Sequence, residues 1–361
     1  MIYKIFRPTI FQIDPEITHN LAIDFLRFCP KTATLFCLNR EYDNLQVKEF
    51  GLQFKNPVLM AAGFDKNAQV ALTLEKFGFG AVECGTVTPI AQQGNEKPRI
   101  FRLKEDKAII NRLGFNNLGA DIFAENINEI SNKIQIPLGI NIGKNKDTEN
   151  ALEDYLPLLE RFYNKASYIT INISSPNTKN LRDLQKQDHL DLFLNEIMKK
   201  KNELKDKNGK DVALLLKVAP DLNLDEQYNI AEIVMKNSVN GMIISNTTID
   251  RNLNLKSKNF SETGGLSGKP LLTKSNDVLK NFYKFTDGKV PLIGVGGISS
   301  AADAYEKIKC GASLVQIYSA FIYEGFGLVE KIKKELSKMV EKDGFKNISE
   351  AVGVNFNMQK L

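Results

Sequence analysis

Residues 168–180, YITINISSPNTKN, join a short apolar, β-rich run to a polar segment. Runs that are apolar on both faces are typical of strands buried in a parallel sheet. Seven more such runs lie at residues 57–63, 80–88, 138–143, 213–220, 241–247, 291–297 and 313–319. Amphipathic stretches separate them, among them 124–134, 224–237 and 300–311, the last with Gly311 as a helix C-cap. Eight strand–helix units predict a (β/α)8 TIM barrel, and an open doubly wound sheet is the alternative.

The bulk composition is that of a globular protein large enough for a sizeable core. The chain has 361 residues, of which 43% are hydrophobic and 25% are charged, and its net charge of +5 is mild. We interpret its one dense lysine run, 199–211, as a solvated helix end and loop, so nucleic acid is not an expected partner. The four cysteines form no C-x-x-C pair, which argues against a metal site and favours a reduced cytoplasmic setting.

Residues 1–45 do not share the strand–helix rhythm. Asp14-Pro15-Glu16 forms a good N-cap and first turn, and Ile17, Leu21, Phe25 and Phe28 then recur near helical spacing. A second short amphipathic helix fits after Pro30. We therefore predict an N-terminal amphipathic helical extension, 1–45, and a barrel domain, 46–361. The helices either dock on the barrel or lie on a membrane surface.

The polar residues at the predicted strand ends indicate the chemistry, because catalytic groups of such barrels lie at the carboxyl ends of the strands. Neither histidine of the chain, His19 or His189, is at a strand end, so Ser175 lacks the usual activator of a nucleophilic serine. Lys66 and Lys217 are the cations there. Amides suit a neutral planar ligand with alternating C=O and N–H groups, and five asparagines lie at or near these ends or in mouth loops: Asn111, Asn141, Asn172, Asn177 and Asn246.

Two further features narrow the ligand. Lys217 interrupts the apolar run ALLLKVA (213–219), so it is either a Schiff-base lysine or a charge beside the electron-rich end of a flavin. Glycines cluster late in the barrel, in TGGLSG (263–268) and GVGGIS (294–299), before Tyr318-Ser319. Backbone N–H groups at that end of a barrel commonly hold phosphate, so a phosphorylated ligand is favoured.

Together these motifs resemble class 2 dihydroorotate dehydrogenases, the membrane-associated, quinone-linked enzymes of pyrimidine synthesis. The resemblance runs in order from about residue 1 to 335 and is carried by AAGFDKN (61–67), GTVTP (85–89), PRIFRL (98–103), NRLGFNN (111–117), INIGKNK (140–146), NISSPNT (172–178), KVAPDL (217–222), SNTTIDR (245–251), TGGLSGKPL (263–271), GVGGI (294–298) and GASLVQIYSAF (311–321). It implies an FMN-binding TIM barrel with an N-terminal helical pair at the quinone entry. The reaction implied is the oxidation of (S)-dihydroorotate to orotate in UMP biosynthesis, with hydride leaving C6 for FMN and a proton leaving C5.

Residue roles follow from the same resemblance. One FMN per subunit would contact Ala62, Gly63, Phe64, Asp65, Lys66, Thr86, Asn141, Asn172, Lys217, Ser245, Gly268, Gly297, Tyr318 and Ser319. Dihydroorotate or orotate would contact Lys66, Asn111, Arg112, Leu113, Gly114, Phe115, Asn172, Asn177, Asn246 and Thr247. Ser175 would be the base, with Thr178 passing the proton on, and His19 and Arg102 would line the quinone tunnel. We also expect peripheral binding, through residues 1–45, to the cytoplasmic face of the inner membrane, and no metal; the oligomeric state is left open, with a monomer favoured.

The departures from the family pattern are few. Phe64 replaces the more familiar Leu, Ser245 replaces Thr, and Lys179-Asn180 stands where Pro-Gly is usual, on the loop that carries Ser175. Class 1 enzymes carry Cys at the position of Ser175 and lack the N-terminal extension, so both features favour class 2. The other hypotheses are a class 1-like enzyme using fumarate or NAD, a Schiff-base aldolase built on Lys217, and a membrane-bound binding protein without catalysis.

Overall fold

The eight predicted strands form a closed parallel barrel in a computed structural model that describes residues 2–35 and 37–357. Met1, Phe36 and residues 358–361, which the predicted extension and barrel domain include, lie outside the described residues. In chain order the barrel strands are β3 (Val58–Met60), β4 (Ala81–Val87), β7 (Leu138–Ile142), β8 (Tyr168–Asn172), β9 (Ala213–Val218), β10 (Gly241–Ile244), β12 (Leu292–Val295) and β13 (Ala312–Ile317). Because β13 pairs with β3, the sheet closes on itself, and the doubly wound alternative is wrong.

Strand register brings the predicted polar residues to one end of the barrel. Asn172 at the end of β8 lies opposite Lys217 on β9, and Asn141 on β7 lies opposite Gly85 on β4. All residues of β7, β8 and β9 are buried, as expected for strands covered on both faces. Lysine and asparagine side chains therefore lie in a buried part of the sheet, at the carboxyl ends of its strands.

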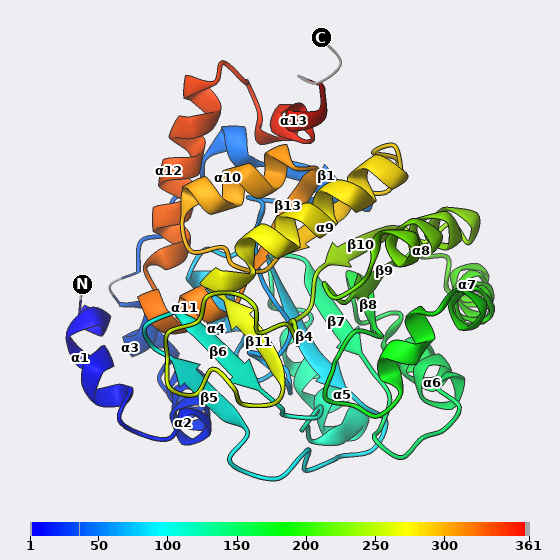
Figure 1. Cartoon of the computed structure of the whole chain (residues 1–361), viewed down its shortest axis with the longest axis horizontal. Helices are drawn as coiled ribbons and strands as arrows, with labels where there is room; N and C mark the ends of the chain where they lie inside the picture. Colours follow the sequence, from blue (N-terminus) through cyan, green and yellow to red (C-terminus); the bar gives the residue numbers. More distant parts are fainter. Residues whose placement is uncertain (1, 36, 358–361) are drawn as a thin grey trace.

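Helices surround the barrel, as the amphipathic stretches predict (Figure 1). They are α4 (Ala71–Lys76), α5 (Gly119–Ile130), α6 (Leu152–Phe162), α7 (Gln187–Asn208), α8 (Leu224–Lys236), α9 (Leu272–Phe285), α10 (Ala301–Lys309), α11 (Ser319–Glu324) and α12 (Leu328–Lys342), before a short α13 (Val354–Asn357). The C-cap of α10 is Cys310, and the predicted Gly311 lies one position later with φ +110°, the place after a helix end where glycine is favoured. The helix predicted at 124–134 both begins and ends earlier, at Gly119–Ile130, and the Asn117 side chain accepts the Gly119 N–H at its start at 2.8 Å.

Two long connections leave the barrel and meet above its mouth. The first contains β5 (Ile100–Leu103) and β6 (Ala108–Asn111), and the second contains β11 (Gly265–Gly268). These strands form an antiparallel sheet in the order β11-β6-β5. The hairpin of β1 (Val47–Glu49) and β2 (Leu52–Phe54) lies at the other end, where its Phe50 touches the start of β10 at Gly241.

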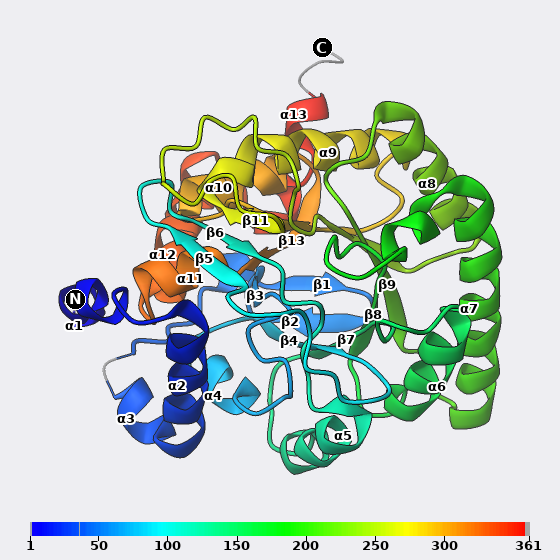
Figure 2. The ribbon, with the colours of Figure 1, turned by 60° about the horizontal axis from the view of Figure 1, so that its bottom comes forward.

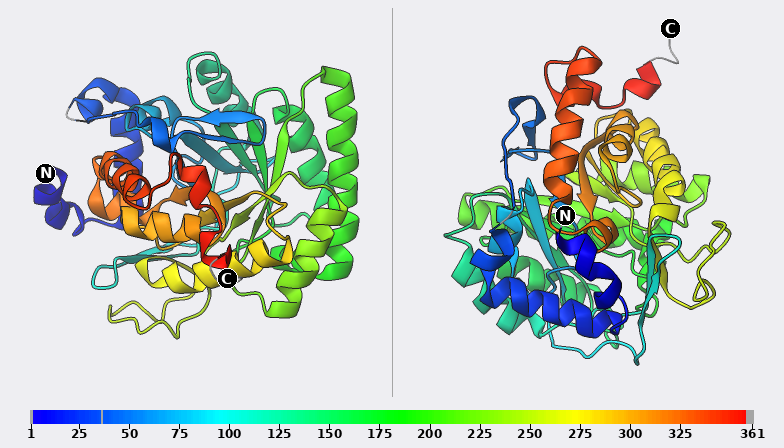
Figure 3. Two further views of the ribbon diagram at one scale, coloured as in Figure 1. Left: turned by 90° about the horizontal axis from the view of Figure 1, so that it is seen from above. Right: turned by 90° about the vertical axis from the view of Figure 1, so that its left-hand side faces the viewer.

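The N-terminal extension contains α1 (Ile2–Ile10), α2 (Pro15–Phe28) and α3 (Pro30–Thr34), so it has one helix more than predicted. The Asp14 side chain caps α2 by accepting the N–H groups of Glu16 and Ile17, as expected. These helices lie together on one side of the barrel, and α7 lies on the opposite side (Figures 2 and 3). No helix in the described part of the chain has the length and apolar character needed to cross a membrane.

The α2 helix both docks on the barrel and exposes apolar side chains. Ile23 and Leu26 are buried in the main core, and Glu16 forms an ion pair with Arg99 at 2.6 Å. The predicted apolar stripe faces outward instead, with exposed fractions of 54% for Ile17, 57% for Leu21, 40% for Phe25 and 71% for Phe28. The α2 helix therefore docks on the barrel through one face and leaves the apolar side chains of its other face exposed.

Candidate active site

A cavity opens at the carboxyl end of the barrel, beneath the β11-β6-β5 sheet, and most of the predicted site residues line it. Strand ends, the connection after β6 and the segment before α11 supply its walls. The predicted residues that line it are Ala62, Gly63, Lys66, Thr86, Asn111, Leu113, Gly114, Phe115, Asn172, Ser175, Asn177, Lys217, Ser245, Asn246, Thr247, Gly268, Gly297, Tyr318 and Ser319. Segments from almost every strand end converge on this one cavity.

Five predicted residues lie behind the lining rather than in it. Phe64 packs edge-on against Tyr318 and Phe321, and the buried Asp65 carboxylate accepts the N–H groups of Gln69 and Val70. Arg112 turns outward to an ion pair with Glu262 at 2.8 Å. The other two, Asn141 and Thr178, are buried next to lining residues.

A network of amides supports the floor of the cavity. Asn172 Nδ2 donates to Thr86 Oγ1 and to Asn141 Oδ1, both at 3.0 Å, and Thr86 donates to the same Asn141 oxygen at 2.6 Å. Asn141 in turn donates to the buried Glu83 carboxylate at 2.8 Å. Buried polar groups with satisfied partners hold their neighbours in one orientation. The Asn172 amide is thus fixed from below, while it faces the cavity.

Several lining residues were not predicted from the sequence, and two of them, Gln316 and Asn116, make polar contacts at the cavity. Gln316 donates to Glu83 at 2.8 Å, and its Oε1 is a buried acceptor without a partner among the described residues. Asn116 accepts a hydrogen bond from Lys66 Nζ at 2.9 Å. The signal for Gln316 is the one that identified Lys217, a polar residue inside an apolar strand (SLVQIYS, 313–319).

The two predicted lysines, Lys66 and Lys217, bring positive charge to the cavity from different strand ends. Lys217 is buried at the end of β9, and no hydrogen bond from its ammonium is present in the described part of the chain. Burial lowers the pKa of Lys217, while the Glu83 carboxylate opposes that shift. Burial, opposed by Glu16 and reinforced by Arg99, lowers the pKa of Lys66 to about 8. Both ammonium groups therefore gain from an anionic or electron-rich ligand.

The Ser175 loop places one hydroxyl at the cavity and a second behind it. Ser175 is buried, and its Oγ accepts the Asn177 N–H at 3.2 Å. Ser174 Oγ instead donates to Asn172 Oδ1 and accepts from Asn246 Nδ2, so it orients two lining amides. No histidine is hydrogen-bonded to Ser175 within residues 2–35 and 37–357, which argues against hydrolase chemistry.

The Lys179-Asn180 departure fits this loop without distortion. Asn180 has φ 58° and ψ 8°, the left-handed conformation that Gly and Asn adopt most readily. Asparagine thus serves where the family pattern has glycine. Thr178 is buried two positions earlier, and its Oγ1 is without a partner among the described residues.

The glycine-rich end fits the phosphate and ring of the FMN that the resemblance implies. Gly63 has φ +102°, and a Cβ there would project into open space at the cavity. Gly268 and Gly297 have positive φ angles, and a Cβ on either would lie within 2.5 Å of neighbouring backbone. Gln316 Oε1 and the Lys217 ammonium have no hydrogen-bond partner among the described residues, so the cavity offers an acceptor and a cation beside glycines that a larger residue would not replace, which fits a phosphorylated flavin.

The structure places both predicted tunnel residues between the N-terminal helices and the barrel. The His19 ring on α2 packs edge-on against the Phe64 ring, with 5.7 Å between the ring centroids. Burial and the Lys66 charge lower the pKa of His19 to about 3, so its ring is neutral near pH 7. Arg102 on β5 donates to the Ile13 carbonyl at 2.8 Å and lies over the Phe11 ring. These contacts connect the extension to the cavity wall.

Comparison with known proteins gives one consistent result. A family model described as dihydroorotate dehydrogenase matches residues 44–340. A Vibrio parahaemolyticus protein named dihydroorotate dehydrogenase (quinone) is 49% identical over 93% of this chain and 100% of its own length. A Rhodopseudomonas palustris protein of the same name is 45% identical over 97% of this chain and 95% of its own. The crystal structure of Eimeria tenella DHODH in complex with ferulenol has a TM-score of 0.90 and 40% identity, covering 95% of this chain and 96% of that one. The chain therefore belongs to the dihydroorotate dehydrogenase family, in its class 2 branch.

Proposed function

We propose that this chain is a dihydroorotate:quinone oxidoreductase that converts (S)-dihydroorotate to orotate in de novo UMP biosynthesis. The observation that carries the proposal is that one cavity is lined by Ser175, by Lys217 and by a set of asparagine amides held by hydrogen bonds. No histidine in the described part of the chain is hydrogen-bonded to Ser175. The names of the relatives support the same substrate and acceptor. A Schiff-base aldolase would use Lys217 alone and would leave the amide set and Ser175 without a role.

The cofactor we propose is FMN, one per subunit. Gly268, Gly297 and the Tyr318-Ser319 segment would hold its phosphate end, and Lys217, Asn172 and Thr86 would surround its ring. When bound, FMN would supply hydride acceptance from C6 of dihydroorotate and electron delivery to a quinone. The buried Lys217 ammonium would favour negative charge at the ring.

The residues around the substrate divide into those that bind it and two that move a proton. The Lys66 ammonium would meet the dihydroorotate carboxylate, and Asn111, Asn177 and Asn246 would pair with the ring C=O and N–H groups. Ser175 Oγ would take the proton from C5 of the substrate. As Ser175 Oγ takes that proton, its own hydroxyl proton would pass to Thr178 Oγ1, which is buried and unpartnered in the described structure, and Thr178 would pass a proton on to water.

We also propose that residues 1–45 bring the enzyme to the cytoplasmic face of the inner membrane as a peripheral monomer. The exposed apolar side chains of α2 support this, since an apolar helix face flanked by polar residues gains free energy at a lipid interface. A quinone leaving that surface would pass His19 and Arg102, which lie between the helices and the barrel.

The test is rapid-mixing reduction of the bound flavin by dihydroorotate, followed by reoxidation with a quinone, fumarate or NAD. We expect Ser175→Ala to slow reduction by about 10²- to 10⁴-fold, the usual contribution of a positioned base. Ser349→Ala, at an exposed position, is the matched control and should leave the rate unchanged. Reduction as fast in Ser175→Ala as in the wild type would refute the base, and reoxidation by fumarate or NAD in place of a quinone would refute the acceptor.

A further inference from the structure

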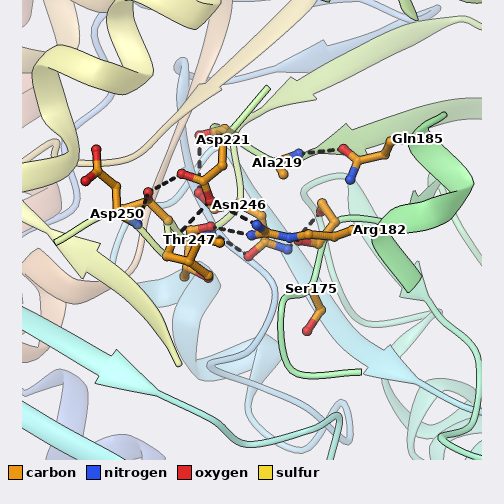
Figure 4. A network of polar contacts seen from close by, with 12 residues as sticks. Ser175, Arg182, Gln185, Ala219, Asp221, Asn246, Thr247 and Asp250 are labelled. Atoms are coloured by element: carbon orange, nitrogen blue, oxygen red, sulfur yellow. Dashed lines mark hydrogen bonds and ion pairs between the residues drawn. The ribbon is translucent and has the colours of Figure 1, made fainter. Parts of the chain in front are cut away.

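The Arg182 side chain joins three active-site loops behind the cavity. It belongs to the short 3-10 helix η2 (Leu181–Gln185), which begins directly after the Ser175 loop. Its Nε donates to the Ser174 carbonyl at 3.0 Å and its Nη2 donates to the Thr247 carbonyl at 2.9 Å. Figure 4 shows the guanidinium group between these loops, with the Ser175 side chain pointing away from it. Arg182 therefore acts on the backbone of the site and not on the Ser175 hydroxyl.

Asp221 anchors this guanidinium from the loop after β9. Its carboxylate pairs with Arg182 Nη1 at 2.9 Å and with Lys274 at 2.9 Å, and it accepts hydrogen bonds from Thr248 Oγ1 and the Ile249 N–H. Burial would raise the pKa of Asp221, but these hydrogen bonds and Lys274 outweigh it and lower the pKa. The carboxylate is thus ionised near pH 7 and holds the guanidinium in one orientation.

A second contact in the same helix supports the same arrangement. Gln185 Oε1 accepts the Ala219 N–H at 2.9 Å, so η2 is attached at both ends to the segment 219–221 (Figure 4). The Arg182 and Asp221 side chains are 22% and 13% exposed, so water competes little for these bonds. These contacts need a planar group with several N–H donors in fixed directions, which the Arg182 guanidinium has and a lysine ammonium does not.

We propose that Arg182, held by Asp221, is a positioning residue for the substrate half of the reaction. By fixing the carbonyls next to Ser175 and Asn246, it sets the distance between the proton acceptor and the bound substrate. This inference rests on the proposed function, in which Ser175 takes the C5 proton. It assigns a role to a charged pair that touches neither substrate nor cofactor.

The experiment compares the two half-reactions of the full-length holoenzyme. We expect Arg182→Met and Arg182→Lys each to slow flavin reduction by saturating dihydroorotate about 100-fold, the loss expected for a misplacement of about 1 Å. Reoxidation by a quinone should stay at the wild-type rate. Deuterium at C5 of dihydroorotate should slow reduction more in the variants than in the wild type, because proton transfer becomes more difficult, whereas the effect of deuterium at C6 should not increase.

Arg161→Met is the matched control, since Arg161 also pairs with an aspartate, Asp121, but on the outer surface at 41% exposure. Arg182→Lys keeps the positive charge and the aliphatic part of the side chain, so it tests the need for the planar guanidinium group even if Arg182→Met folds poorly. Reduction in both Arg182 variants at the rate of Arg161→Met would overturn the proposal, as would equal losses in both half-reactions. A wild-type holoenzyme whose flavin dihydroorotate does not reduce would instead overturn the proposed function.

Discussion

Replacing Phe28 by serine is expected to weaken binding of the protein to lipid vesicles by about 5- to 30-fold. Full burial of a phenylalanine side chain is worth about 1.5–3 kcal/mol. Phe28 is 71% exposed on the outer face of α2, so about 1–2 kcal/mol remains to be gained at a membrane surface. At about 1.4 kcal/mol for each factor of ten, that free energy gives the stated range. Co-sedimentation with vesicles of bilayer lipids, at several lipid concentrations, measures it directly.

Leu192→Ser provides the matched control, because Leu192 is also 71% exposed but lies on α7, on the far side of the barrel from α2 (Figures 1 and 2). Flavin reduction by dihydroorotate in solution should be unchanged in both variants, since neither residue lines the cavity. Vesicle binding by Phe28→Ser equal to that of the wild type, or an equal loss in Leu192→Ser, would show that the outer face of α2 is not the membrane-binding surface.

Three further perturbations test other parts of the structure. The pKa of Lys66 is lowered to about 8, so its positive charge is present below that pH and lost above it. Orotate binding, measured by titration of the flavin absorbance, should therefore weaken about tenfold per pH unit above pH 8. Lys66→Met should abolish this pH dependence. Glu16→Gln leaves the buried Arg99 without a counter-charge and should weaken docking of the N-terminal extension by about 3 kcal/mol. Limited proteolysis should then cut the extension, residues 1–45, faster than in the wild type. The pKa of Glu16 is lowered, because the Arg99 hydrogen bond outweighs burial, so this stabilisation should be present at neutral pH and lost on acidification through that lowered pKa. Gly297→Ala places a Cβ 2.4 Å from the first residue of α9, at a position with φ +79°, and this variant should purify without FMN. Gly327→Ala is the control, because its Cβ would have no neighbour within 4 Å, and it should keep its FMN. Retention of FMN by Gly297→Ala would contradict the assignment of Gly297 to the phosphate site.

The barrel strands were predictable because burial on both faces leaves a strong local mark. A run such as YITIN, in β8, has no charged residue and is rich in β-branched and aromatic side chains, so its composition identifies it without any tertiary information. The first N-terminal helix was missed because IYKIFRPTI carries a proline and has no acidic residue in its first turn. Its side chains are held by distant partners, as when Arg7 donates to the Tyr323 carbonyl.

The candidate site was predictable to the level of which strand ends carry polar side chains. Lys217 was identified because a lysine inside an apolar strand is costly unless a partner compensates it. Gln316 carries the same signal but was missed, and its partner Glu83 comes from a strand far away in the sequence. The direction of a side chain at a strand end depends on the pleat and on neighbours, which explains why Arg112 points outward to Glu262 and not into the cavity.

By itself the sequence determined the eight-unit barrel, the polar strand ends and the separate N-terminal extension, because each of these depends on local periodicity and composition. Only the tertiary structure decided which face of α2 is exposed and which loops Arg182 joins. Both depend on contacts between residues far apart along the chain, such as Glu16 with Arg99 and Arg182 with Asp221. A pairwise ion contact leaves no periodic trace in either segment, so it becomes visible only when the barrel brings the two segments together.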